Sequence, residues 1–132
     1  MSSGIGFVFP GQGSQSIGMG KALYEAFPAL KAVYDEASSV LGYDSAALCF
    51  DGPAERLNLT EYTQPALLVS SIAALRALDS AGLTPLAVAG HSLGEYSALV
   101  AAGGVSFRDA VGLVQKRGRY MSEAVAPGTG QV

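Results

Sequence analysis

The feature that most restricts the fold of this chain is a serine between two glycines at the end of an apolar run. Residues 86–89 are apolar and predict a buried β-strand, and residues 90–94 read Gly-His-Ser-Leu-Gly. A helical pattern then covers residues 93–102. In this strand–turn–helix context a Gly-x-Ser-x-Gly sequence forms a nucleophile elbow, in which the serine occupies a strained backbone bend. Side chains at Gly90 and Gly94 would collide with the neighbouring strand and helix.

A second apolar run, at residues 5–9, predicts another buried strand. Between the two runs, apolar residues recur at helical spacing. Strands that alternate with helices predict an α/β fold with a parallel β-sheet flanked by helices. Residues 44–62 are expected to be irregular. One helix is expected from Gly18 with a break at Pro28 and a stop at Gly42, and another from near Thr63, with Pro65 in its first turn, to Gly82. Two more are expected from about Leu93 to Ala102 and from Ser106, with Asp109 in its capping box, to about Val125.

Two strands are too few to make a domain with a parallel sheet. We therefore expect residues 1–132 to form one segment of a larger domain. A turn is expected at 127–130, and the start of a further strand at 131–132.

Composition excludes several classes of protein. Eight Lys and Arg residues against eleven Asp and Glu residues give a net charge of −3, which excludes a cationic nucleic-acid binder. Apolar residues make up 49% and charged residues 14% of the chain, which excludes a disordered protein. The single cysteine, Cys49, excludes an internal disulfide and a multi-cysteine zinc site. No apolar run reaches the ~18 residues of a membrane span, so we expect a cytoplasmic protein. We also expect no bound metal.

The elbow predicts that Ser92 is a catalytic nucleophile. The helix that begins beside it directs free N–H groups toward an oxyanion, and the Leu93 N–H is the expected first donor. Gln12 lies in a glycine-rich loop after the other strand, and parallel strands would bring its N–H to the same sheet edge as the second donor. The alternatives are a tight strand–helix turn and a glycine-rich loop without chemistry. The loop is not a phosphate loop, because no Gly-Lys-Ser/Thr follows it.

A serine hydroxyl needs a proton acceptor, which is normally a histidine. His91 is the only histidine, and adjacent side chains at a strand end point in opposite directions. We expect His91 to pack behind the elbow as a supporting residue and not to accept the proton of Ser92. Either the base lies beyond Val132, or Ser92 is not a nucleophile.

Four blocks of sequence carry a family resemblance. They are Phe-Pro-Gly-Gln-Gly-Ser-Gln at 9–15, Thr-Gln-Pro-Ala at 63–66, Gly-His-Ser-Leu-Gly-Glu-Tyr-Ser-Ala at 90–98, and Arg117-Gly118 with Met121. In this order they resemble the malonyl-CoA:acyl carrier protein transacylases of bacterial fatty acid synthesis. The acyltransferase domains of polyketide and fatty acid synthases share these blocks, and the resemblance runs through essentially the whole chain.

The resemblance implies roles for individual residues. Ser92 would be the acylated nucleophile, and the N–H groups of Gln12 and Leu93 would form the oxyanion hole. Arg117 would bind the free carboxylate of the malonyl group, because a planar guanidinium can grip a carboxylate with two parallel hydrogen bonds. Without the resemblance, Arg117 would be interpreted as a solvated helix residue. Gln64 would be a pocket residue.

The resemblance also implies an α/β-hydrolase-like large subdomain that is interrupted by a ferredoxin-like small one. Residues 1–132 would be the first segment of the large subdomain, and the catalytic histidine would lie outside them, so we expect the isolated chain to be inactive. The implied reaction is a ping-pong transfer of malonyl from malonyl-CoA, through Ser92, to the phosphopantetheine thiol of acyl carrier protein. It needs no bound cofactor, nucleic acid or membrane. A serine esterase with the same elbow and a non-catalytic fragment are the alternatives.

Overall fold

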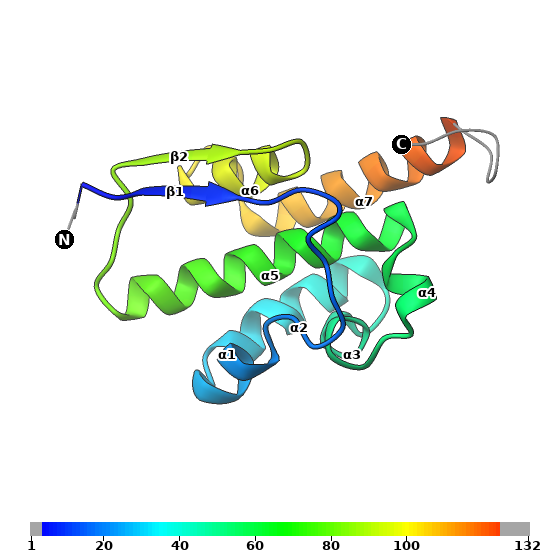
Figure 1. Ribbon diagram of the computed structural model, residues 1–132, viewed down its shortest axis with the longest axis horizontal. Coiled ribbons are helices and arrows are strands. Elements are labelled where there is room, and N and C mark those ends of the chain that lie inside the picture. The colour runs from blue at the N-terminus through cyan, green and yellow to red at the C-terminus, as the bar shows by residue number, and fades with distance from the viewer. Residues whose placement is uncertain (1–3, 125–132) are drawn as a thin grey trace.

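The computed structural model describes residues 4–124 (Figure 1). The predicted α/β fold with a parallel sheet and flanking helices is confirmed. In chain order the elements are β1 (Gly6–Phe9), α1 (Lys21–Ala26), α2 (Leu30–Leu41), α3 (Ser45–Asp51), α4 (Ala54–Leu57), α5 (Thr60–Ser80), β2 (Ala87–Gly90), α6 (Gly94–Ala101) and α7 (Phe107–Ala124). The turn predicted at 127–130 and the strand predicted at 131–132 lie outside the described residues.

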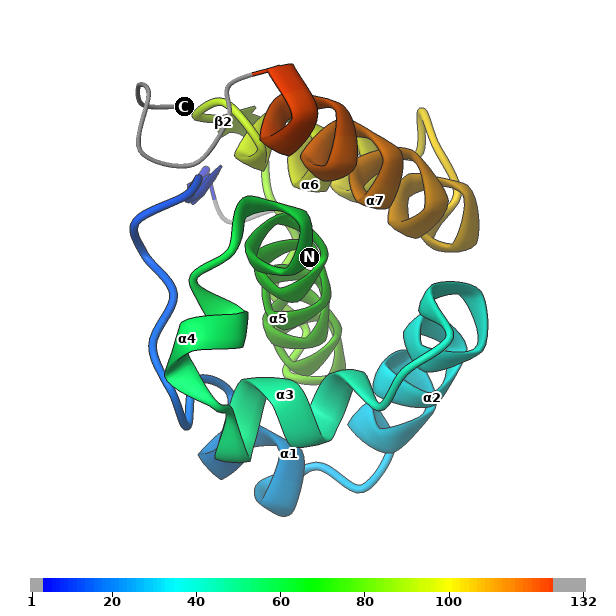
Figure 2. The same cartoon turned by 90° about the vertical axis from the view of Figure 1, so that its right-hand side faces the viewer.

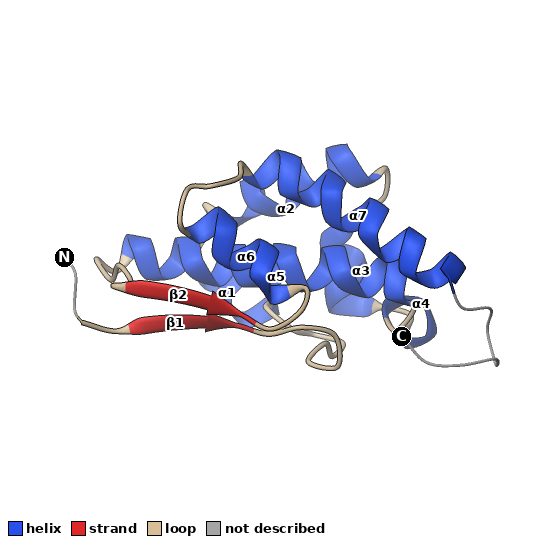
Figure 3. Cartoon of the chain, turned by 90° about the horizontal axis from the view of Figure 1, so that it is seen from above, coloured by secondary structure: helices blue, strands red, loops and turns tan. Residues whose placement is uncertain are grey.

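The two strands pair in parallel and end at the same edge. The register runs from Gly6 opposite Ala87 to Phe9 opposite Gly90, and the two arrows in Figure 1 point the same way. Figure 3 shows α5, α6 and α7 on one side of the pair. Because the strands are parallel, the loop after β1 and the turn after β2 both leave from this edge.

The outer face of the strand pair contradicts the prediction of two buried strands. Val8 in β1 is 82% exposed, and Leu86, just before β2, is 70% exposed. Phe9 is buried and Phe7 is partly buried against the core, so side chains alternate between a covered and an open face. Apolar composition predicts the strands, but it does not tell how many faces other elements cover.

Helix α5 runs through the centre of the molecule (Figures 1 and 2). Every residue from Thr63 to Val69 is buried, so this part of the helix is covered on all sides and not along a single stripe. Helices α2, α6 and α7 pack around it and contribute buried residues such as Tyr34, Val100 and Val111. Burial of this apolar cluster is the main stabilising term of the fold.

The prediction that residues 44–62 are irregular is wrong. They form α3, α4 and the first turn of α5, which begins at Thr60, three residues earlier than predicted. Helices of seven and four residues are too short to show a periodic apolar pattern. Asp44 caps α3 by accepting a hydrogen bond from the Ala47 N–H at 3.0 Å. As a result of the earlier start, Pro65 lies in the second turn of α5 and not in the first.

The other helix boundaries agree with their sequence signals. Pro28 lies between α1 and α2, and Gly42 follows α2 with a φ of 85°. At the start of α7 the Asp109 N–H donates to Ser106 Oγ at 3.1 Å.

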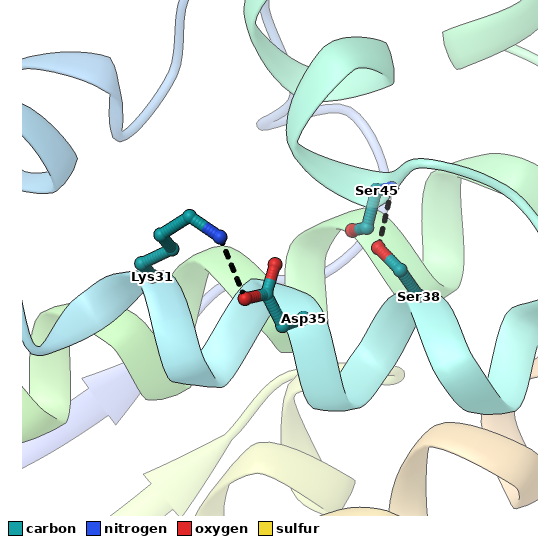
Figure 4. Close-up of polar contacts among 4 residues, drawn as sticks. All are labelled: Lys31, Asp35, Ser38 and Ser45. Carbon is teal, nitrogen blue, oxygen red and sulfur yellow. Dashed lines mark hydrogen bonds and ion pairs between the residues drawn. The ribbon is translucent and has the colours of Figure 1, made fainter.

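Figure 4 shows the junction between α2 and α3. The N–H of the buried Ser45 donates to Ser38 Oγ at 2.9 Å, which satisfies a donor that has no partner within its own helix. On the exposed side of α2, Lys31 Nζ and Asp35 form an ion pair at 2.9 Å. Both side chains of the pair are mostly exposed, so the hydrogen bond at Ser45 matters more for stability.

Candidate active site

Ser92 occupies a strained backbone bend between β2 and α6. Its φ is 54°, and within residues 4–124 it is the only non-glycine residue with a positive φ. This conformation is costly for a residue with a Cβ and tends to occur at functional turns. The bend agrees with the predicted elbow, and Ser92 is exposed at the carboxyl edge of the strands.

Close backbone contacts require both glycines of the elbow. A Cβ on Gly90 would lie 2.1 Å from the carbonyl of Gly94, and a Cβ on Gly94 would lie 2.2 Å from the carbonyl oxygen of Phe9. Both distances are far shorter than the ~3.5 Å of a normal carbon contact. Glycine therefore lets α6 begin directly against the ends of both strands, as the sequence predicts.

The loop after β1 lies directly beside the elbow. A Cβ on Gly11 would lie 2.6 Å from the carbonyl oxygen of His91, so the two segments meet through their backbones. Gln12 Nε2 donates to Thr60 Oγ1 at 3.0 Å, which fixes the loop to the start of α5. The structure therefore places the Gln12 loop at the same sheet edge as Ser92, as expected.

The two expected oxyanion donors are backbone N–H groups at this edge. Leu93 directly precedes α6 as its N-cap, where backbone N–H groups have no partner inside the helix. Within residues 4–124, neither the Leu93 N–H nor the Gln12 N–H donates a hydrogen bond to the protein. Gln12 is exposed, whereas Leu93 is buried, so the role of these two N–H groups as oxyanion donors stays a prediction.

Arg117 connects α7 to Ser92. Its Nη2 donates to Ser92 Oγ at 3.2 Å, and its Nη1 donates to Gln64 Oε1 at 2.7 Å. The guanidinium carbon lies 5.6 Å from the centre of the Tyr96 ring, within the range of a cation–π contact. Three elements, the elbow with α6, α5 and α7, thus converge on one cationic group.

Gln64 holds Arg117 from the buried side. Its side chain is only 1% exposed, and its Nε2 donates to the sulfur of Met121 at 3.2 Å. The amide is therefore oriented by one partner on each side, with its oxygen toward the guanidinium. A buried acceptor fixed in this way restricts where the guanidinium can lie.

His91 makes no hydrogen bond to Ser92 among the described residues, and its side chain lies by the backbone of Gly11. His91 is exposed, so the supporting role expected for it stays a prediction. The general base that Ser92 needs stays a prediction.

The sequence analysis missed three contributors to the cluster. Tyr96 and Met121 stand in the quoted blocks but were given no role, and Gly118 was not singled out beyond its block. Two spacings point to Tyr96 and Met121. Met121 follows Arg117 by four residues in α7, which is one helical turn, and Tyr96 follows Ser92 by four residues, in the first turn of α6.

Other described features do not form a second candidate site of this kind. No group of three or more His, Cys, Asp or Glu residues that could hold a metal occurs within residues 4–124. The same part of the chain has no helix with the length and hydropathy needed to cross a membrane. A cavity of about 450 Å³ lies between β1 and α5, but neither Ser92 nor Arg117 lines it.

Comparison with known families decides which kind of elbow this is. Residues 6–131 match the family model of the acyl transferase domain. The chain belongs to that acyltransferase family. The resemblance seen in the four sequence blocks is thereby confirmed.

Two curated relatives illustrate the similarity to other acyltransferases. The chain is 59% identical over 128 residues to the malonyl CoA-acyl carrier protein transacylase of Bacillus subtilis strain 168, and 54% identical over 125 residues to that of Escherichia coli K12. These alignments cover 97% and 94% of this chain but only 40% of each relative. The chain thus spans about two fifths of the length of these acyltransferases.

Solved acyltransferase structures share the fold. An acyl carrier protein S-malonyltransferase from Vibrio cholerae superposes with a TM-score of 0.91 at 53% identity, covering 96% of this chain and 42% of that one. A malonyl-transacylase solved in complex with its type II polyketide acyl carrier protein, AntF, gives a TM-score of 0.91 at 53% identity. It covers 96% of this chain and 41% of the other.

Proposed function

We propose that the protein containing this chain transfers a malonyl group from malonyl-CoA to the phosphopantetheine thiol of acyl carrier protein, in fatty acid biosynthesis. The observation that carries the proposal is the hydrogen bond from Arg117 Nη2 to Ser92 Oγ at 3.2 Å. It supports the proposal because a guanidinium, which can bind a carboxylate, lies beside the elbow serine of an acyltransferase domain. The names of the relatives agree with this substrate and acceptor.

In the first step, Ser92 Oγ attacks the thioester carbon of malonyl-CoA. The hydroxyl proton passes to a general base, which the family resemblance assigns to a histidine outside these 132 residues. A C–O bond forms as the carbonyl π bond opens, and the negative charge on the carbonyl oxygen meets the N–H groups of Gln12 and Leu93. Collapse breaks the C–S bond, the base returns its proton to sulfur, and coenzyme A leaves as the thiol.

In the second step, the phosphopantetheine thiol of the carrier protein attacks the malonyl ester of Ser92. The base takes the thiol proton, the C–O bond to Ser92 breaks, and the serine oxygen recovers a proton. The acceptor is thus a thiol in place of water. The partner is inferred from the carrier-protein complex of the relative described above.

Arg117 selects acyl groups that end in a carboxylate. In a malonyl ester a single CH2 group separates the free carboxylate from the ester carbon, so a guanidinium in contact with Ser92 Oγ is close enough to bind the carboxylate. Gln64 keeps one edge of the guanidinium occupied and leaves the edge toward Ser92 for the ligand. An acetyl group offers no carboxylate and gains nothing from this cation.

Intact-mass measurement of the whole protein that contains this chain, exposed to malonyl-CoA, tests the proposal. We expect a malonyl adduct that Ser92→Ala abolishes. With malonyl-CoA and acetyl-CoA in competition, Arg117→Ala should lower the ratio of malonyl to acetyl adduct by about 100-fold, the cost of a lost charged hydrogen-bond pair. Gln64→Leu should lower it by about 10-fold, because Arg117 keeps its charge but loses its buried partner.

Three outcomes would contradict the transfer reaction. Rapid release of malonate without an adduct would indicate the esterase alternative, and the absence of any reaction would indicate a non-catalytic fragment. Equal loss of malonyl and acetyl adducts in Arg117→Ala would remove the carboxylate-binding role of Arg117.

A further inference from the structure

We propose that Gly118 is a positioning residue for Arg117 and thereby sets the preference of the site for acyl groups with a carboxylate. The inference rests on the proposed function of Arg117. Gly118 contacts no substrate itself. It acts through the distance between α7, which carries Arg117, and α5, which carries Gln64.

Gly118 lies at a close backbone contact between the two helices. It is buried, and a Cβ at this position would lie 2.8 Å from Glu61 Cα and 3.0 Å from the carbonyl oxygen of Thr60. Both atoms belong to the backbone of the first turn of α5, so no side-chain rotation can relieve the contact. The separation of packed helices depends on the side chains between them, and here there is none.

Helix propensity alone does not explain this glycine. A glycine inside a helix is destabilising relative to alanine, so a buried glycine in α7 needs a packing reason. Gly112 in the same helix provides the contrast, because a Cβ there would lie 3.8 Å from Val40 Cγ1, which is ordinary contact. Gly118 is therefore required by a close approach that Gly112 does not make.

The close approach acts directly on the carboxylate-binding group. Arg117 precedes Gly118, and Gln64 lies one turn after Glu61, so both ends of the 2.7 Å hydrogen bond between them flank the contact. A methyl group at residue 118 must move about 0.7 Å away from Glu61 Cα to reach normal carbon contact. The bond from Arg117 to Ser92 Oγ is 3.2 Å long, and we expect a shift of this size between α7 and α5 to weaken it.

The test measures competing acylation by malonyl-CoA and acetyl-CoA in Gly118→Ala, with Gly112→Ala as the matched control in the same helix. We expect Gly118→Ala to lower the malonyl-to-acetyl adduct ratio by about 10-fold, because displacements under 1 Å have large effects on positioned groups. Gly112→Ala should leave the ratio within about 2-fold. Malonyl-CoA and acetyl-CoA compete for the same folded molecules, so the ratio of the two adducts does not depend on how much of the variant is folded.

Arg117→Ala distinguishes a failure of this inference from a failure of the proposed function. In the Arg117→Ala background, Gly118→Ala should change the ratio by less than about 2-fold, because the group it positions is gone. An unchanged ratio in Gly118→Ala, or loss of both adducts, would overturn the role of Gly118 while Arg117→Ala still shifts the ratio. If Arg117→Ala itself leaves the malonyl-to-acetyl ratio unchanged, the result contradicts the proposed role of Arg117 and not only that of Gly118.

Discussion

The strand end that carries Ser92 and the helical body that carries Arg117 are held together in different ways. At the strand end, backbone meets backbone at Gly11, Gly90 and Gly94, with no side chain between. In the helical body, buried apolar side chains fill the space between α2, α5 and α7. The comparison teaches that Ser92 is positioned by backbone contacts, whereas side-chain packing holds most of the helical body, with the backbone contact of Gly118 against α5 as an exception.

The largest effect should come from adding one methyl group to the strand end. We expect Gly94→Ala to lower the free energy of unfolding by at least ~3 kcal/mol, because its Cβ would overlap the Phe9 carbonyl oxygen at 2.2 Å. Gly104→Ala is the control, since a Cβ there meets Leu99 at 3.6 Å. It should stay within ~1 kcal/mol of wild type in urea unfolding. Similar values for the two variants would break the comparison.

A smaller effect should appear when the helical body is titrated with alkali. Burial raises the pKa of the Cys49 thiol from 9.0 to about 12, and a hydrogen bond from Ser45 offsets part of the rise. The unfolded thiol loses its proton at lower pH than the folded one, so the free energy of unfolding falls as pH rises from about 9 to 12. We expect this fall to be steeper in wild type than in Cys49→Ala by up to about 1.4 kcal/mol per pH unit.

Urea unfolding of both proteins between pH 9.5 and 11.5 measures the two slopes. Ser92→Ala serves as the control, because an exposed serine does not titrate and its removal should leave the wild-type slope. Equal slopes for wild type and Cys49→Ala would mean that water reaches the thiol, and that the helical body is not closed as described.

The smallest effect should come from one hydrogen bond inside the helical body. Ser38→Ala removes the acceptor for the N–H of the buried Ser45, and we expect a loss of about 1 kcal/mol in the free energy of unfolding. The neighbouring Ser39 is exposed, and its hydrogen bonds to Glu36 and Arg108 lie at the surface, so Ser39→Ala should cost less than ~0.5 kcal/mol. A cost above ~3 kcal/mol for Ser38→Ala would show that the body, like the strand end, depends on single backbone contacts.

The same difference explains what could be predicted from the sequence. The elbow is local: five consecutive residues specify its glycines, its serine and its bend, and the structure agrees at each of them. The meeting of Arg117 with Ser92 is not local, because it depends on how α7 crosses α5. Only the family resemblance pointed to Arg117, and no periodic pattern signals the close approach at Gly118.

Two further differences have a physical origin. The helices α3 and α4 are too short for apolar periodicity, so their caps and turns were the available signals. The exposed outer face of β1 shows that apolar residues can predict a strand without predicting whether both of its faces are covered by other elements.

The bond from Arg117 to Ser92 also orients the serine hydroxyl. A hydroxyl oxygen has two lone pairs and one proton, and the guanidinium, which can only donate, occupies one of the lone pairs. The proton must then point away from the cation. In the proposed reaction, the group that deprotonates Ser92 would therefore approach the hydroxyl from a direction that Arg117 does not occupy.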